Sequence, residues 1–277
     1  MGQTLVIAEK PSVAGDIARA LGGFKKDGDF WVSDAMIVGS AVGHLLEIKA
    51  PEEYDVKRGR WSFANLPVLP PHFDLQPIKK SIKKFEGLEK KIRSRSVTDI
   101  INACDAGREG ELIFRYIIQA TGTKKPIRRL WLQSMTKASI QKAFTALRSD
   151  AEMKPLEAAA RSRSEADWLV GINGTRALTA FNSKDGGFFL TTVGRVQTPT
   201  LAIVVAREEE ITHFKPQNYW EVHTTFGAQA GDYDSVWVDA DFKKTKGQSA
   251  ELKPERLWTA AEAQAIVAKC QGKLGIV

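Results

Sequence analysis

Short apolar runs rich in β-branched residues alternate with helical segments over roughly residues 1–150, and no other feature limits the fold as strongly. TLVIA, AMIVGSAVGH, VTDIINACD and IRRLWLQS have the composition of buried strands. Amphipathic segments at 12–21, 109–121 and 137–148 have the period of helices. Strands that alternate with helices in this way form a parallel sheet covered by helices. The sequence therefore predicts an α/β domain.

The pattern changes twice further along the chain. An insertion brings the proline-rich WSFANLPVLPPHF and then a lysine-rich helix at 79–95, which we expect to lie outside the sheet as a solvated face. Residues 155–212 are typical of helices interrupted by a glycine-rich loop, whereas YWEVHTTF and DSVWVDADF alternate as antiparallel strands do. The expected domains are 1–153 with an insertion at about 50–95, a helical segment at 154–212, and a β-rich region at 213–277.

The last residues have the pattern of a strand that is not completed. A predicted helix at 259–269 leads into GKLGIV, and no polar turn follows that would close a sheet. We expect a truncated chain from a longer protein. The alternative is a short protein whose last strand pairs at a sheet edge.

Composition excludes several classes of protein. No apolar run reaches the roughly 18 residues of a membrane span, and Met1 is followed directly by a strand-like run, so we expect a cytoplasmic protein without a membrane partner. Cys104 and Cys270, both in apolar surroundings, fit neither a disulfide framework nor a zinc site. A formal net charge of +7 favours a polyanionic partner such as nucleic acid.

Two predicted strand ends carry reactive side chains. LVIAEKPS delivers Glu9 and Lys10, and VTDIINACD delivers Asp105. Because the carboxyl ends of parallel strands form the ligand crevice, we expect these three side chains at one edge of the sheet. An acid, a lysine and a metal-binding acid pair suit phosphoryl transfer. The alternative is an exposed ion pair at a strand end.

The stretch DAGREGE, residues 105–111, concentrates acids at a strand-to-helix junction. Asp105 and Glu109 can converge on magnesium, which prefers oxygen ligands and keeps several waters. We expect Gly107 to allow a tight turn between them. For Glu111, a ligand role and simple stabilisation of the helix dipole stay open, and capping alone is also the alternative for the pair.

Seven segments resemble one known family. IAEKPSVA and DAGREGELIF resemble the Toprim domain of type IA DNA topoisomerases, and five others resemble the topoisomerase III branch in the same order: SAVGHLLEI, WSFANLPVLP, LWLQSMTKASIQKAF, ARSRSEADWLVGINGTRALT and VGRVQTPTLAIVVAREEEI. The resemblance covers Leu5 to about Trp220. It implies a Toprim-like parallel sheet flanked by helices, then a helical segment and the first strands of a β-rich arch domain.

The resemblance also implies roles for residues in the crevice. Glu9 resembles the family's acid near the scissile phosphate, and Lys10 resembles the cation that stabilises or protonates that site. Asp105 and Glu109, together with Glu9, match the magnesium site.

One position in this motif departs from the family. The family commonly has a second aspartate where Gly107 stands, which bears on metal affinity or stoichiometry more than on function. Arg108 is expected to direct its guanidinium at the DNA backbone. His44 matches a family position near the active site, although a lone histidine is often structural.

Two segments are expected to contact single-stranded DNA. Arg163 and Asp167 stand one helical turn apart, so the simple interpretation is an intrahelical ion pair, whereas the resemblance implies that this helix faces the DNA. In VGRVQTP, Gly194 and the following amides at a helix start predict an anion site, with Arg195 and Gln197 as donors. The alternative is a loop-to-helix cap with a surface arginine.

The nucleophile of the family is missing from this sequence. Type IA enzymes cut one strand with a tyrosine hydroxyl, in a segment resembling ITYPRTDS, and leave a 5′ phosphotyrosine. None of the four tyrosines has that context: Tyr54, Tyr116, Tyr219 and Tyr233. We therefore expect the nucleophile after Val277 and an inactive chain. No nucleotide-binding P-loop occurs, so the longer parent is expected to relax DNA without ATP.

Two other functions stay open on the sequence. One is a stand-alone Toprim nuclease or primase-like enzyme that uses a metal and Glu9 with water as nucleophile. The segments GRVQTP and ADWLVG argue against it, because a nuclease needs neither. The other is a single-stranded DNA-binding module without catalysis, which Gly107 and the missing tyrosine favour.

Overall fold

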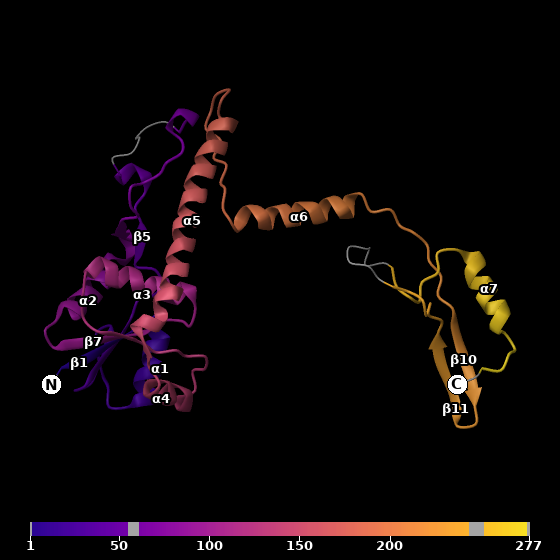
Figure 1. Ribbon diagram of the computed structural model, residues 1–277, viewed down its shortest axis with the longest axis horizontal. Helices are drawn as coiled ribbons and strands as arrows, with labels where there is room; N and C mark the ends of the chain where they lie inside the picture. Colours follow the sequence, from indigo (N-terminus) through magenta and orange to yellow (C-terminus); the bar gives the residue numbers. More distant parts are fainter. Residues whose placement is uncertain (1, 55–60, 244–251, 276–277) are drawn as a thin grey trace. The chain divides into compact units, whose positions relative to one another are not determined.

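A computed structural model describes residues 2–54, 61–243 and 252–275. The chain divides into two compact units, Met1–Ala202 and Ile203–Val277 (Figure 1). Each unit is described by itself below. The expected domain borders near 153 and 212 stay a prediction.

The first unit is built on a seven-stranded sheet with the strand order β2-β3-β4-β1-β7-β8-β9. The four central strands β4, β1, β7 and β8 are parallel, as the sequence predicts, so the expected α/β fold class is confirmed. Antiparallel pairs complete both edges, which the sequence analysis did not foresee. The strands are β1 (Gln3–Ala8), β2 (Lys25–Asp27), β3 (Phe30–Val32), β4 (Met36–Ser40), β7 (Val97–Ala103), β8 (Ile127–Arg129) and β9 (Arg148–Ser149).

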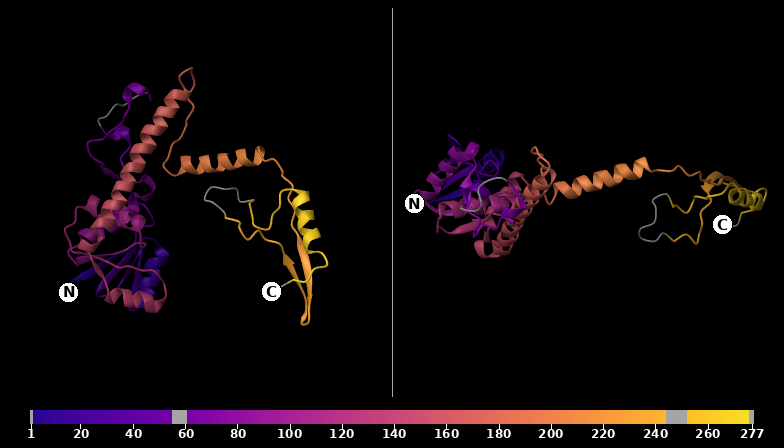
Figure 2. Two further views of the ribbon diagram at one scale, coloured as in Figure 1. Left: turned by 45° about the vertical axis from the view of Figure 1, so that its right-hand side comes forward. Right: turned by 90° about the horizontal axis from the view of Figure 1, so that it is seen from above.

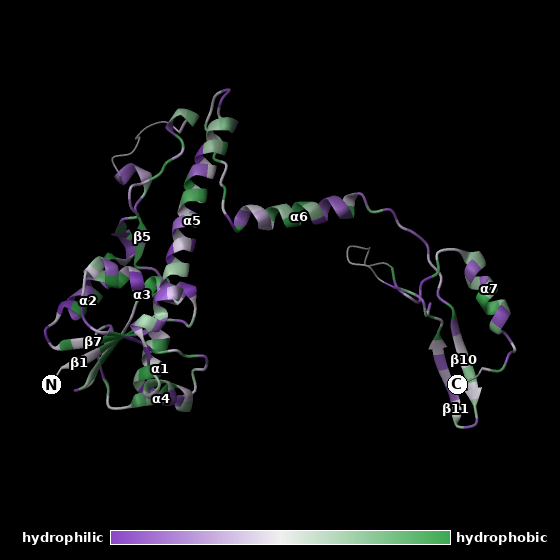
Figure 3. Ribbon diagram, in the orientation of Figure 1, coloured by the Kyte–Doolittle hydropathy of each residue, from purple (hydrophilic) through white to green (hydrophobic). Residues whose placement is uncertain are grey.

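Strands β1 and β7 lie at the centre of this sheet, and the side chains of their second halves, most of them apolar, are buried on both faces. Ile7 pairs with Asn102, Ala8 pairs with Ala103, and the strand partners are almost fully buried. Continuous apolar runs are typical of parallel strands that helices cover on both sides. Figure 3 shows this apolar character as green ribbon in the middle of the sheet.

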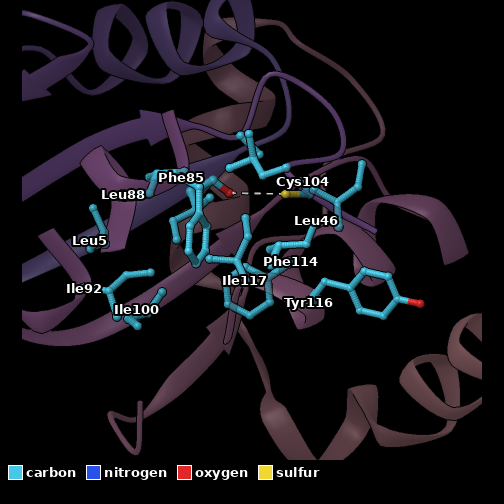
Figure 4. Close-up of a cluster of buried hydrophobic side chains, with 14 of the residues drawn as sticks. Leu5, Leu46, Phe85, Leu88, Ile92, Ile100, Cys104, Phe114, Tyr116 and Ile117 are labelled. Carbon is cyan, nitrogen blue, oxygen red and sulfur yellow. Dashed lines mark hydrogen bonds between the residues drawn. The ribbon is translucent and has the colours of Figure 1, made fainter. Parts of the chain in front are cut away.

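Helices cover both faces of the sheet. Helices α1 and α4 pack together on one side, where Ile17 and Ile140 are buried in the same cluster. Helices α2, α3 and α5 lie on the other side, over a larger cluster that includes Phe114 and Ile117 (Figure 4). The helices of this unit are α1 (Pro11–Leu21), α2 (Ile82–Arg93), α3 (Arg108–Thr121), α4 (Lys137–Thr145), α5 (Asp150–Asn182) and the first residues of α6 (Gln197–Thr212).

The lysine-rich helix α2 differs from its expected role as a solvated face outside the sheet. Phe85, Leu88 and Ile92 recur on one side and are buried in the core next to β7. The lysines occupy the other side. The apolar positions are three or four residues apart, so this is an amphipathic helix that helps to cover the sheet.

The insertion between β4 and α2 packs against the long helix α5. It contains a two-stranded ladder of β5 (Leu46–Ile48) and β6 (Leu75–Pro77). The Asn173 side chain of α5 bonds both backbone groups of Val68, accepting from its N–H at 2.6 Å and donating to its carbonyl at 3.0 Å. Trp168 donates to the carbonyl of Lys49 at 3.2 Å. In both figures the helix runs beside this insertion (Figures 1 and 2).

The second unit contains the expected antiparallel strands. β10 (His223–Ala228) and β11 (Gly231–Val236) form a hairpin, and α7 (Ala260–Cys270) follows. The expected final strand is not seen at residues 272–275, and residues 276 and 277 lie outside the described residues. Across the described parts of the chain, no helix combines the length and apolar character of a membrane span.

Candidate functional site

The ends of β1 and β7 bring the predicted acids and lysine together. Glu9 directly follows β1, whereas β7 ends at Ala103, so Asp105 lies two residues beyond its strand. The Lys10 ammonium is 3.2 Å from Asp105 Oδ2 and 3.9 Å from Glu9 Oε1. The backbone N–H of Asp105 donates to Glu9 Oε2 at 3.4 Å. Neighbouring parallel strands thus place all three residues at one sheet edge.

Lys10 is held in its charged form. The hydrogen bond to Asp105, the charge of Asp105 and the charge of Glu9 raise the pKa of this exposed ammonium above its usual value. Lys10 is therefore a cation at neutral pH and not a base. Glu9 is the least exposed of the three, with 13% of its side chain accessible.

Gly110, and not Gly107, is the glycine that the loop after β7 requires. A Cβ on Gly110 would lie 2.2 Å from the backbone oxygen of Asp105 and 2.6 Å from its nitrogen. Gly107 has extended backbone with φ 172° and ψ 179°, and a Cβ there would meet nothing within 4 Å. The expectation that Gly107 permits a tight turn is therefore wrong.

A buried arginine that sequence reasoning missed holds the same loop from behind. Arg129, at the end of β8, is 1% exposed. Its Nη1 donates to the carbonyls of Asn102 and Cys104 at 3.1 and 2.7 Å, and its Nη2 donates to the carbonyl of Asp105 at 2.7 Å. The guanidinium thus fixes the backbone that carries Asp105. The sequence IRRLW gives no sign that one of its arginines points inward.

Glu111 supplies the negative charge that faces the guanidiniums of Arg129 and Arg115. It is fully buried, 2.7 Å from Arg115 Nε and 3.5 Å from Arg129 Nε, and it accepts from the Asn102 amide at 3.0 Å. A carboxylate enclosed by two guanidiniums and an amide is out of reach of solvent. Glu111 also lies in the first turn of α3, which is compatible with the helix-dipole role left open for it, and the buried ion pair is a structural role that the sequence did not indicate.

Glu109 is paired with His44 from the loop after β4. His44 Nε2 lies 2.5 Å from Glu109 Oε1. In that loop, Val42 has φ 59° and Gly43 has φ 81°. A positive φ is unusual for a β-branched residue. The N–H of Gly43 donates to the carbonyl of Glu9 at 3.2 Å, which ties this loop to the end of β1.

A cavity of about 240 Å³ separates the start of α3 from α5. His44, Arg108 and Glu109 line it on one side, and Arg163 and Asp167 line it on the other. The structure thus brings the predicted DNA-binding helix next to the predicted metal-binding segment. Arg108 is exposed at this cavity.

Asp167 joins the two predicted DNA-contacting arginines. It lies 3.7 Å from Arg163 Nε on its own helix and accepts from Arg195 Nη1 at 2.8 Å. The intrahelical pair is therefore present, and Arg195 from the following loop completes it. At the start of α6 the Gly194 N–H donates to Thr198 Oγ1 at 3.1 Å, so this amide is not free for an anion. The exposed Gln197 is the first residue of α6.

The carboxylates near the crevice suit magnesium by chemistry but do not form a three-ligand cluster. Among the described residues, no three His, Cys, Asp or Glu side chains lie close enough to share an ion. Asp105 and Glu109 are 51% and 67% exposed, so water can complete a coordination shell. Magnesium is commonly held by one or two carboxylates with waters and substrate phosphates. The residues present therefore fit an ion of this kind.

Both halves of the chain match the profiles of known protein families. The family profile of the Toprim domain matches residues 4–135, and the profile described as DNA topoisomerase matches residues 151–277. DNA topoisomerase 3 of Bacillus subtilis is 39% identical over 270 residues, which are 97% of this chain and 36% of that protein. DNA topoisomerase 3 of Bacillus cereus is 44% identical over 261 residues, 93% of this chain and 34% of that protein.

The chain belongs to the type IA DNA topoisomerase family. It spans about a third of the length of the topoisomerases it matches. Its fold is similar to that of full-length topoisomerase I from Thermotoga maritima, with a TM-score of 0.53 and 23% identity. That likeness covers 89% of this chain and 36% of the other. The part of the chain that matches the Toprim profile therefore contains the crevice, and the second profile begins with helix α5.

Proposed function

We propose that this chain is the part of a topoisomerase III-like isomerase that binds single-stranded DNA and assists magnesium-dependent cleavage and rejoining of one strand. The observation that carries the proposal is the ammonium of Lys10 between Glu9 and Asp105, at the strand edge where ligands bind. Membership in the family, and the side chains of helix α5 that line the cavity beside this edge, support it.

In the proposed reaction a tyrosine oxygen bonds to the scissile phosphorus, and the bond from phosphorus to the 3′ oxygen breaks. Lys10, held as a cation, stabilises charge on the phosphate oxygens. The tyrosine hydroxyl loses its proton as its oxygen bonds to phosphorus, and Glu9, largely shielded from solvent, accepts this proton and donates one to the departing 3′ oxygen. Rejoining runs the same steps in reverse.

Magnesium, when bound by Asp105 and Glu109, would supply electrostatic stabilisation of phosphate charge. Arg129 keeps the Asp105 carbonyl and its neighbours fixed. His44 holds Glu109 at the edge of the 240 Å³ cavity. These two contacts orient the carboxylates before any substrate arrives.

We propose that the nucleophile belongs to the longer protein. Burial raises the pKa of Tyr54 and of Tyr116, which makes both poor nucleophiles. Tyr116 also donates its hydroxyl to Ser164 at 2.9 Å. Tyr219 and Tyr233 lie in the second unit, in ring contacts with Trp258 and Phe226.

Single-stranded DNA is the proposed substrate because Arg163 lines the cavity beside the crevice, Arg195 pairs with Asp167 in the wall of that cavity, and Arg108 lines its opposite side. Asp167 holds the first two in place at 3.7 and 2.8 Å. Guanidiniums match phosphate geometry better than ammonium groups do. Gln197 and the loop around Gly194 extend this surface toward α6.

The test uses the full-length protein with supercoiled plasmid, magnesium and no nucleotide. We expect relaxation, and a protein-linked 5′ end when the reaction is stopped with denaturant. A requirement for ATP would contradict the proposal. Nicking without a covalent adduct would favour the Toprim nuclease, and binding without any cleavage would favour a module without catalysis.

A further inference from the structure

A second cavity shares no lining residue with the cavity between α3 and α5 and takes no part in the proposed reaction. It has a volume of about 590 Å³, which is in the size range of ligand pockets. The start of α1, the β2–β3 hairpin and the segment before α2 enclose it. We call this cavity the hairpin groove.

The hairpin groove adjoins the residues of the crevice. Pro11 and Ser12 line it and directly follow Lys10 in the chain. Val42 also lines it, and its neighbour Gly43 bonds the carbonyl of Glu9. The groove therefore begins next to the residues that carry Glu9 and Lys10.

The groove is strongly basic. Four cationic side chains line it against one carboxylate, Asp29: Arg19, Lys26, Lys80 and Lys84. Asp29 lies 3.0 Å from Lys84, and Asp16 pairs with Arg19. Within the described parts of the chain, Lys26 and Lys80 have no carboxylate at ion-pair distance. The positive charge of these two ammonium groups is available to an external anion.

The groove also offers an aromatic surface beside its free charge. Trp31 lines the wall, and the Lys26 ammonium lies 5.7 Å from its ring centroid. Helix α1 starts there with no acid in its first turn and no side-chain cap, so its positive dipole end is not neutralised. Aromatic rings next to cations are the usual surface for single-stranded nucleic acid.

We propose that the hairpin groove binds the phosphate backbone of the DNA strand where it leaves the catalytic crevice, with Lys26 and Lys80 as the phosphate contacts. The inference rests on the proposed function, because it extends the path of the same single-stranded substrate. It assigns a role to the β2–β3 hairpin and to the lysines before α2.

The test compares two double variants of the 277-residue chain, Lys26→Ala/Lys80→Ala and Lys124→Ala/Lys142→Ala. Both lose the same charge from exposed positions, but Lys124 and Lys142 do not line the groove. Single-stranded oligonucleotides of two lengths are titrated at several salt concentrations, and thermal unfolding checks that each variant is folded. A hairpin duplex is titrated in parallel.

The groove variant should bind the longer oligonucleotide more weakly, and its log-log salt slope should be shallower by about 1.4, or about 0.7 per lost phosphate contact. The control variant should keep the wild-type slope. Equal slopes for the two variants would overturn the inference, as would a loss confined to the duplex. If the wild-type chain bound no single-stranded oligonucleotide at all, both the proposed function and the proposed role of the groove would be contradicted.

Discussion

At the scale of single residues, Gly110 decides the position of Asp105 because it has no side chain. Helix α3 starts so close to the end of β7 that Gly110 touches the backbone of Asp105. Only glycine allows this approach, because any Cβ would overlap backbone atoms that cannot move aside. Gly107, although nearer to the acids in the sequence, has open space around it.

Gly110→Ala should therefore destabilise the chain, whereas Gly107→Ser should not. We expect a loss of about 1–3 kcal/mol for the first, as for other overpacked sites, and a change within about 0.5 kcal/mol for the second. Urea unfolding measures both. Equal stability of the two variants would show that the loop moves to accept a side chain.

Glu9→Gln should reduce cleavage by the full-length protein much more than it reduces binding. An amide keeps the size and polarity of the side chain but cannot transfer a proton, so the loss should appear in the chemical step. Single-turnover cleavage and oligonucleotide affinity are measured side by side. If affinity fell as far as the cleavage rate, Glu9 would be a binding residue.

The sequence predicted which charged residues lie beside Asp105, but not the residues that hold the surrounding backbone and side chains in place. That Glu9, Lys10 and Asp105 meet follows from a general rule for parallel strands. The role of Gly110 and the contact between His44 and Glu109 depend on how closely two elements approach, and no local pattern encodes that distance. For the same reason the tight turn was assigned to the wrong glycine.

At the scale of elements, β7, α3 and β8 are joined by a buried network around Arg129. Its guanidinium donates to the carbonyl of Asn102 in β7 and to two carbonyls of the following loop, and Glu111 of α3 supplies the opposite charge. Replacing one member leaves the other charge buried without its partner, which is costly. The network therefore couples the stability of the sheet edge to the position of Asp105.

Arg129→Met should lower the free energy of unfolding by about 3–5 kcal/mol, the usual cost of breaking a buried ion pair. Arg128→Met is the matched control, because Arg128 is 48% exposed and pairs with Asp99 at the surface. Surface pairs contribute about 0–1 kcal/mol. Similar losses for both variants in urea unfolding would contradict the structural role of Arg129.

The elements themselves were largely predictable, since periodicity depends on residues that are near in sequence. The parallel core of the sheet and the helices were expected within a few residues of their observed ends. The antiparallel edge strands β2, β3 and β9 were missed because they are only two or three residues long. The burial of α2 was missed because its lysines outnumber the apolar residues that face the core.

At the scale of the whole molecule, the chain holds the proposed binding residues and a crevice, but none of its four tyrosines is in a reactive setting. We therefore expect the 277-residue chain to bind single-stranded DNA weakly and not to cut it. Binding should weaken as salt rises, with a log-log slope of about −0.7 for each phosphate contact. A labelled oligonucleotide with magnesium, analysed on a denaturing gel, tests this expectation. A covalent adduct would mean that one of the four tyrosines is the nucleophile.

The two cysteines differ in accessibility, and this gives the chain a built-in attachment point. Cys104 is buried next to the carbonyl of Ile7 (Figure 4), and burial raises the pKa of its thiol. Cys270, at the end of α7, is exposed, contrary to the apolar surroundings expected from the sequence. Because thiolates are the reactive form, a maleimide dye should label Cys270 alone in the native protein and both thiols in denaturant. A fluorophore can then be placed on the second unit without any engineered cysteine.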